Sequence, residues 1–335
     1  MQLNIDLAGS SIWKTISGLF SFRYNSSLLL LYGKLKKMLY LGEAAAVITS
    51  ITFAINSALF TLAGIEVGPL VVNRLRLVAA SFFLIAAHWI FLGTPWPISA
   101  DFDRWFWLGL SGIVGLVVGD AFLFQAFVWV GPRISMLMMS LAPILAAFTA
   151  WIFLGEALTW WQLFGILLTI IGVMWVVLEK KQNQGPQKEN YLRGILFGLG
   201  GAIGQALGFV LAKIGLGDLF SPISGNFIRM FTAMIVIWLI TIIQKQARAT
   251  IQHVVDYPNA LWKIIGGAFS GPFLGVSLSL FALQYTSIGV ASTLMALPPI
   301  FLLPLDYFYF KERFGWGAIA GTLIAMLGVA VLFLV

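Results

Sequence analysis

The chain has 335 residues, of which 60% are hydrophobic and only 10% are charged, and it includes 13 Trp and 28 Phe. This composition leaves too little polar surface for a soluble domain of that length, so it predicts an integral membrane protein in a lipid bilayer. The absence of cysteine excludes disulfides, thiolate catalysis and Cys-ligated metals. A net charge of +7 is typical of basic loops in polytopic proteins, so we expect no nucleic-acid partner.

In chain order, the sequence begins with an extension, residues 1–37, whose apolar run at 28–32 is too short to cross a bilayer. We expect this extension to be disordered or to lie on a surface. Stretches of about 20 apolar residues then predict transmembrane helices. There are ten, at residues 41–62, 70–92, 106–129, 135–154, 160–178, 192–213, 223–243, 262–284, 288–309 and 314–335.

The polar linker 181–190 separates two sets of five helices, which are copies of each other. A shift of 156 residues places Gly115 on Gly271, Gly119 on Gly275, Pro143 on Pro299, Glu156 on Glu312, Gly165 on Gly321 and Gly172 on Gly328. The repeats are residues 38–180 and 191–335. Because each repeat has an odd number of helices, the second must enter the membrane from the opposite side. The fold class is therefore an all-α polytopic membrane protein with two inverted five-helix repeats, as in many secondary transporters.

Two related stretches carry a more specific signature. They are SMLMMSLAPILAAFTAWIFLGEALTWWQLFGILLTIIGVMWVV at 135–177 and ASTLMALPPIFLLPLDYFYFKERFGWGAIAGTLIAMLGVAVLF at 291–333. They resemble the helix 4 to 5 signature of the drug/metabolite transporter (DMT) superfamily, EamA type, with a mid-helix proline, a Gly-Glu-like helix end and a G-x6-G helix. The second copy departs from it at Lys311, which replaces Gly155. The resemblance implies a ten-helix carrier of small solutes, often an exporter of amino acids or other metabolites, and it assigns no site residues.

Asp120 is the sharpest single candidate for a functional residue. It lies near the middle of the helix predicted at 106–129, about one and a half turns before Gln125. Ionisable groups at this depth are costly and usually face the interior of the bundle. Asp120 could accept a proton for coupling, pair with a cationic substrate or an arginine, or form a buried structural ion pair.

The segments VVNRLRLV at 71–78 and SGNFIRMF at 224–231 repeat one pattern at a shift of 153 residues. Asn73 and Arg76 recur as Asn226 and Arg229, so each repeat presents an amide and a guanidinium on one helical face. Arg74, nearer the helix start, is expected to snorkel to the headgroups. The shared N-x-x-R face either clamps each helix to its neighbours or contacts substrate.

Further polar residues complete the set of substrate or coupling candidates. Asn56, Gln205 and Gln284 are neutral groups in helix interiors, where interhelical hydrogen bonding and substrate contact are both open. The weaker candidates are Asp306, near the end of its helix, and Glu156 and Glu312, which we expect at the water interface.

Glycine patterns point to packing instead of ligand binding. Small residues four apart occur in three helices, and such ridges allow close helix approach. They are Ser111, Gly115 and Gly119; Gly200, Gly204 and Gly208; and Gly267, Gly271 and Gly275.

Together these observations predict a secondary active transporter of a small organic metabolite, an exporter or exchanger that works by alternating access. A proton or another ion is expected to couple transport, since the chain lacks a Walker A motif. A non-transporting scaffold or sensor and an intramembrane enzyme are the alternatives, but no catalytic motif is present, so we expect no enzyme, no cofactor and no metal.

The expected location is the plasma membrane, as a monomer or homodimer. Basic residues are somewhat more numerous on the face of the linker, which favours a cytoplasmic linker. The family resemblance implies the reverse orientation, with both termini cytoplasmic, and we expect the latter.

Overall fold

The computed structural model describes residues 40–142, 144–145, 148–149, 159–183, 188–217, 220–285, 288–308 and 315–334, and every regular element within these ranges is a helix. Within these ranges, seven helices are long and apolar enough to cross a membrane. In the first repeat the helices are Tyr40–Val67, α2 (Pro69–Leu92), α3 (Phe102–Gly112), the π-helix η1 (Ile113–Gly119), α4 (Asp120–Val130), α5 (Pro132–Met139) and α7 (Trp160–Asn183).

The helices of the second repeat follow in a similar order. Its helices are α8 (Lys188–Leu216), α9 (Pro222–Ile243), α10 (Ala247–Asp256), α11 (Pro258–Ala268), the π-helix η2 (Phe269–Gly275), α12 (Val276–Tyr285), α13 (Ile288–Met295), α14 (Pro298–Phe308) and α15 (Trp316–Leu334). The short helix α10 lies between the predicted spans 223–243 and 262–284, where the hydropathy pattern predicts no transmembrane helix. Two polytopic five-helix repeats are thus present, and the predicted extension 1–37 lies outside the described residues.

The duplication extends to irregular backbone. The π-helices η1 and η2 occupy equivalent residues, 113–119 and 269–275, at the shift of 156. In each, the next amide donates to the carbonyl five residues earlier: Asp120 to Gly115, and Val276 to Gly271. Single wide turns of this kind are rare and often occur at functional sites.

Two helices predicted to be continuous, 135–154 and 288–309, are interrupted. The first breaks after α5 at Ser140 and Leu141, and the second breaks between α13 and α14 at Ala296 and Leu297. These positions are again 156 residues apart. The hydropathy pattern does not show these interruptions, but each lies just before a proline of the sequence, and proline lacks the amide hydrogen needed to continue a helix.

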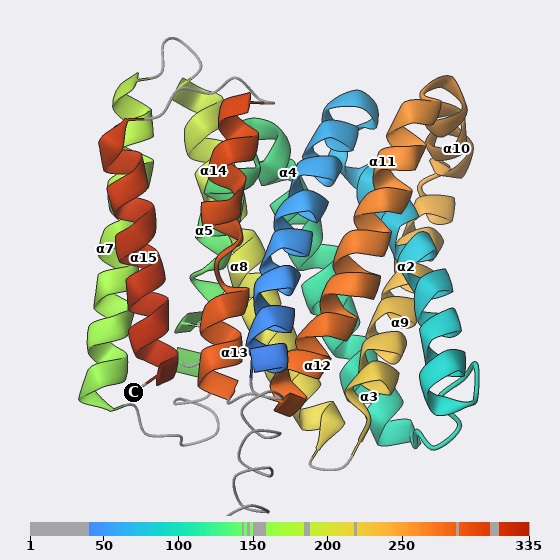
Figure 1. The fold of residues 1–335 in the computed structure, drawn as a ribbon. Coiled ribbons are helices and arrows are strands. Elements are labelled where there is room, and N and C mark those ends of the chain that lie inside the picture. The colour runs from blue at the N-terminus through green and yellow to red at the C-terminus, as the bar shows by residue number, and fades with distance from the viewer. Residues whose placement is uncertain are drawn as a thin grey trace, which may run out of the picture.

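The bundle has two faces, which Figure 1 separates clearly. The C-terminus and the start of the first helix (blue) lie at the lower face, here called the terminal face. The surface helix α10 lies at the opposite end, here called the α10 face. Trp160 and Trp316, equivalent residues that begin α7 and α15, are both highly exposed, as expected for aromatic residues at the edges of the hydrocarbon.

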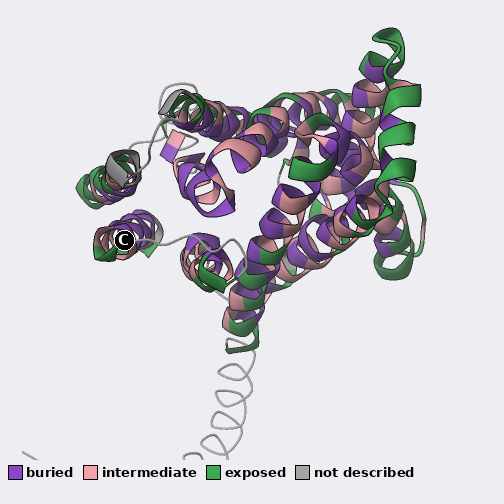
Figure 2. Ribbon diagram, turned by 90° about the horizontal axis from the view of Figure 1, so that it is seen from above, coloured by how far each residue is buried: buried purple, intermediate pink, exposed green. Residues whose placement is uncertain are grey.

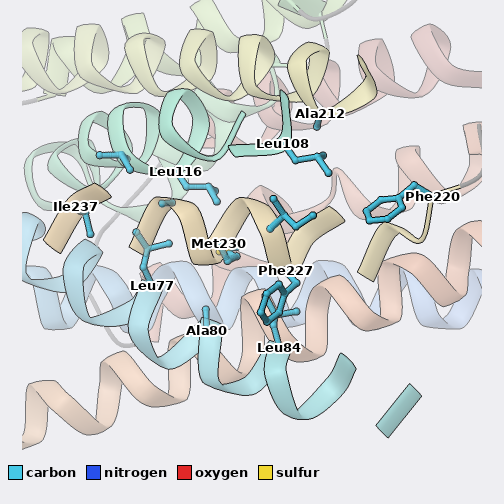
Figure 3. Close-up of a cluster of buried hydrophobic side chains, with 13 residues drawn as sticks. Leu77, Ala80, Leu84, Leu108, Leu116, Ala212, Phe220, Phe227, Met230 and Ile237 are labelled. Carbon is cyan, nitrogen blue, oxygen red and sulfur yellow. The ribbon is translucent and has the colours of Figure 1, made fainter. Parts of the chain in front are cut away.

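The repeats interlock and do not form two separate halves. Helix α2 packs on α9, α4 on α8, and α7 on α15, so helices of the first repeat contact helices of the second along their length. Figure 3 shows one result, a buried cluster in which Leu77 and Leu84 of α2 meet Phe227 and Ile237 of α9. Seen from above in Figure 2, buried residues line the interior and exposed ones the periphery.

Glycines bring these helices into contact, as their spacing predicts. A side chain on Gly204 of α8 would come within 2.5 Å of the Cα of Gly119, and one on Gly172 of α7 would meet the carbonyl of Gly321 at 2.6 Å. The G-x6-G helices, α7 and α15, therefore pack against each other. Close backbone approach, instead of large side-chain surface, is the usual basis of helix association in lipid.

Candidate functional site

A cavity of about 620 Å³ lies inside the bundle. Helices of both repeats contribute to its wall, including both π-helices and both interrupted segments. The wall is mostly apolar and rich in rings and thioethers, from Phe53, Phe60, Phe124, Phe127, Phe209, Met136, Met139, Met230 and Met295. Eight polar side chains interrupt it: Asn56, Ser57, Arg76, Asp120, Gln205, Asn226, Arg229 and Ser279. An apolar cavity with a few convergent polar groups is the usual form of a small-molecule site.

The polar groups from the first repeat bind one another. Arg76 of α2 forms a buried ion pair with Asp120, the first residue of α4. Asn73 orients the arginine, because its Oδ1 accepts a hydrogen bond from Arg76 Nε at 3.1 Å while its Nδ2 donates to the carbonyl of Leu116. Gln205 Nε2 donates to the other carboxylate oxygen of Asp120 at 2.9 Å. This network joins α2, η1, α4 and α8, and it leaves Asp120 fully engaged.

The matching groups of the second repeat are not engaged in this way. The position equivalent to Asp120 is Val276, so no carboxylate is available there for Arg229. Nε of Arg229 and Nδ2 of Asn226 are buried without a hydrogen-bond partner in the described part of the chain. The guanidinium lies over the ring of Phe209, 5.7 Å from its centroid, and it forms no ion pair with a described residue.

The structure therefore brings together most of the predicted site residues. Asn56, on the first helix, also lines the cavity, and its Oδ1 is buried without a hydrogen-bond partner among the described residues. Gln125 is half-buried and is not among the residues that line the cavity. Glu156, Glu312 and the side chain of Gln284 lie outside what the structure describes.

Asp306 does not face the interface, which the sequence left open. It is buried in α14, and its Oδ2 lies 3.0 Å from Nε of Arg133 at the start of α5. The pair links α5 of the first repeat to α14 of the second. It was missed because Arg133 follows a glycine and a proline in what reads as an exposed turn, although Pro132 in fact begins a helix.

Arg74 corrects another expectation. It does not snorkel, because its side chain is buried and bound by α10. Its guanidinium donates to Thr250 Oγ1 at 2.7 Å and to Oε1 of Gln246. The hydropathy pattern predicted no helix between residues 243 and 262, so it could not reveal this partner.

The two ends of the cavity differ. Leu216 and Pro222, the last residue of α8 and the first of α9, line it, so the cavity reaches the terminal face. Toward the α10 face, Phe60 of the first helix packs on Phe124 of α4 with ring centroids 5.2 Å apart. Behind this ring pair lies a buried apolar cluster drawn from both repeats: Ala63, Val67, Val71, Val72, Leu123, Phe127, Val254, Ala260 and Ile264. The Arg133–Asp306 pair adds a further connection at that end.

In the described residues, no group of three or more His, Asp or Glu side chains is placed to hold a metal ion. The cavity instead carries two arginines and one aspartate, 2 − 1 = +1 in formal charge.

Comparisons with known proteins agree with this architecture. One solved crystal structure, titled only "Crystal structure of protein", superimposes with a TM-score of 0.54 and covers 87% of this chain and 96% of its own at 18% identity, which supports the fold alone. A curated relative, an "Uncharacterized transporter" from Archaeoglobus fulgidus, is 37% identical over 75 residues, which is 21% of this chain and 27% of that protein.

The family model described as "EamA-like transporter family" matches twice, over residues 40–178 and 192–334. The two matches coincide with the two inverted repeats and together cover most of the chain. The protein therefore belongs to the EamA-like transporter family of the DMT superfamily.

Proposed function

We propose that this protein is a secondary active transporter that exports or exchanges a small organic solute by alternating access. The observation that carries the proposal is the cavity, which both inverted repeats line, which reaches the terminal face and which side chains close toward the α10 face. A solute held there has access to one side only. Because the repeats are inverted, exchanging equivalent contacts between the two faces would close the terminal face and open the α10 face.

We place the protein in the plasma membrane, with both termini on the cytoplasmic side. The structure then corresponds to the state that loads solute from the cytoplasm, as an exporter requires. A reporter fused to the C-terminus should be active only in the cytoplasm, and activity restricted to the outside would reverse the assignment.

Asp120 is the proposed coupling residue. Protonation of a carboxylate that bridges α2 and α8 would weaken its bond to Arg76 and loosen helices that line the cavity. We expect Asp120→Asn to abolish the acceleration of solute flux by a proton gradient in proteoliposomes. Solute exchange without a gradient should persist at a reduced rate. If gradient-driven flux is unchanged over several pH values, Asp120 does not couple transport.

The contacts near the α10 face form the proposed gate. The residues equivalent to Arg133 and Asp306 are Gly289 and Ala150, so this charged connection has no counterpart at the terminal face. Arg133→Gln should therefore destabilise the closed gate and favour opening at the α10 face. The double variant Arg133→Asp/Asp306→Arg, which keeps the opposite charges, serves as the matched control.

Since the natural chain has no cysteine, one introduced residue reports on this gate. Ala63→Cys places a thiol in the fully buried cluster behind the Phe60–Phe124 ring pair. Labelling by a membrane-impermeant maleimide applied from the α10 face should become several-fold faster with Arg133→Gln, and the charge-swapped control should return it toward the original rate. Equal rates in all three backgrounds would remove the ion pair from the gate.

A further inference from the structure

The charges in the cavity indicate which solutes it can bind. Arg76 is neutralised by Asp120, whereas no carboxylate among the described residues forms an ion pair with Arg229. The surplus charge of the described lining is therefore positive and belongs to the second repeat. Because an isolated cation in an apolar, membrane-embedded site is costly, a ligand that brings a negative charge gains more from binding there than a neutral one.

The free hydrogen-bond donors lie at the same place. Arg229 Nε and Asn226 Nδ2 come from one helical face of α9, and both are buried without a hydrogen-bond partner among the described residues. Buried polar groups in folded proteins are normally satisfied, so two orphaned donors on one wall of a cavity indicate a missing acceptor. A planar carboxylate can accept from a guanidinium and an amide together.

The same network argues against positively charged solutes. Asp120 is the one acidic residue among the described residues that line the cavity, and both of its oxygens are already bound, by Arg76 and Gln205. An amine would have to displace these partners. The carboxylate of a zwitterion could bind Arg229, but its ammonium group would have no free carboxylate among the described lining residues to pair with.

The remaining wall determines the body of the solute. Phe209 contacts the guanidinium of Arg229, and Met230 follows Arg229 in the chain. The other aromatic and methionine side chains named above line the same cavity. Such a surface favours aromatic or branched apolar groups. A volume of about 620 Å³ is in the range of small-molecule sites.

The geometry points to a small monocarboxylate with an apolar or aromatic body as the solute, its carboxylate bound by Arg229 and Asn226. That this ligand is a transported solute rests on the proposed transport function, but its binding can be measured without measuring flux. A failure of the binding inference is therefore distinguishable from a failure of the transport proposal.

The test compares probes of one shape that differ in charge, using the full-length protein purified in detergent and isothermal titration calorimetry. 3-Phenylpropionate is the carboxylate, 3-phenylpropanol the neutral alcohol, 3-phenylpropylamine the cation, phenylalanine the zwitterion and phenyl phosphate the alternative anion. We expect the carboxylate to bind at least about ten-fold more tightly than the alcohol, the amine and the zwitterion, since a hydrogen bond to a charged group contributes about 1.5–3 kcal/mol. This comparison requires no variant.

Two substitutions then locate the charge. Arg229→Gln should remove the preference for the carboxylate, and Arg229→Lys should keep part of it. Val276→Asp installs the acid that the second repeat lacks and should also abolish carboxylate binding while leaving Arg229 in place.

The outcomes separate the two proposals. Tighter binding of the amine, equal binding of all probes or no binding of the carboxylate overturns the inference, and tighter binding of phenyl phosphate replaces the carboxylate by a phosphate group. Carboxylate binding without flux in proteoliposomes would instead leave the inference standing and contradict the transport function.

Discussion

The first and second repeats contain the same Asn and Arg pair, and both arginines line the same cavity, but the two pairs make different contacts. In the first repeat, Asn73 orients Arg76 and Asp120 neutralises it. In the second, Val276 stands in place of the aspartate, and Asn226 and Arg229 retain buried donors without partners among the described residues. A duplicated element has thus become a structural brace in one copy and an open polar site in the other.

This difference is one of local charge, since the backbone is duplicated closely. Both arginines lie in helices that begin with a proline, and the two π-helices that line the cavity occupy equivalent residues. One substitution between copies, aspartate for valine, decides whether the arginine is paired. Inverted repeats can therefore keep a symmetric mechanism while the site itself becomes asymmetric.

The largest expected contrast is between Arg76→Gln and Arg229→Gln. Removing Arg76 leaves Asp120 charged and buried without its cation, which costs about 3–5 kcal/mol in comparable buried pairs. Removing Arg229 breaks no ion pair, so its stability cost should be below about 1 kcal/mol. Thermal unfolding of both purified variants in the same detergent measures the difference. Equal losses would show that the two copies act alike as braces.

A smaller contrast concerns the residue that follows each asparagine, Arg74 in one copy and Phe227 in the other. Phe227 is fully buried and stacks on Phe231 with centroids 5.6 Å apart, so Phe227→Ala should destabilise by about 3 kcal/mol. Arg74→Ala loses its bonds to α10 and should cost about 2 kcal/mol.

The control for this pair is Thr250→Val. It removes one acceptor of Arg74 while keeping the shape of the side chain, and it should reproduce about half of the Arg74→Ala effect. If neither Arg74→Ala nor Thr250→Val changes the stability, the contacts with α10 do not stabilise the position of α2.

Much of the fold and part of the site could be predicted from the sequence. Hydropathy and the fixed shift of 156 residues predict ten helices in inverted repeats, because span length and odd helix number are set by the bilayer. Asp120, Arg76 and Arg229 could be singled out because ionisable residues are costly in hydrocarbon. Their pairing could not, since it depends on which helices face each other.

Other features could not be located from the hydropathy pattern. The π-helices lie in apolar runs where hydropathy stays high, and the prolines after Ala296 do not by themselves show that the helix is interrupted there. Arg133 and Asp306 are far apart in the chain, and each reads as an interfacial residue until α5 and α14 are packed together. Interlocking of the repeats, like these pairs, is a property of the tertiary arrangement.

The smallest contrast isolates the asparagines. Asn73→Ala removes the amide group that donates to the carbonyl of Leu116 and the oxygen that accepts from Nε of Arg76, and it should destabilise by about 1 kcal/mol. Asn226→Ala removes an amide donor that has no partner in the described residues, so it relieves a desolvation cost and should be neutral or slightly stabilising. Its effect should fall on ligand affinity instead, as a several-fold loss for 3-phenylpropionate measured by calorimetry. If Asn226→Ala destabilises as much as Asn73→Ala with unchanged affinity, the second copy is also a brace, and the open site must be sought elsewhere in the cavity.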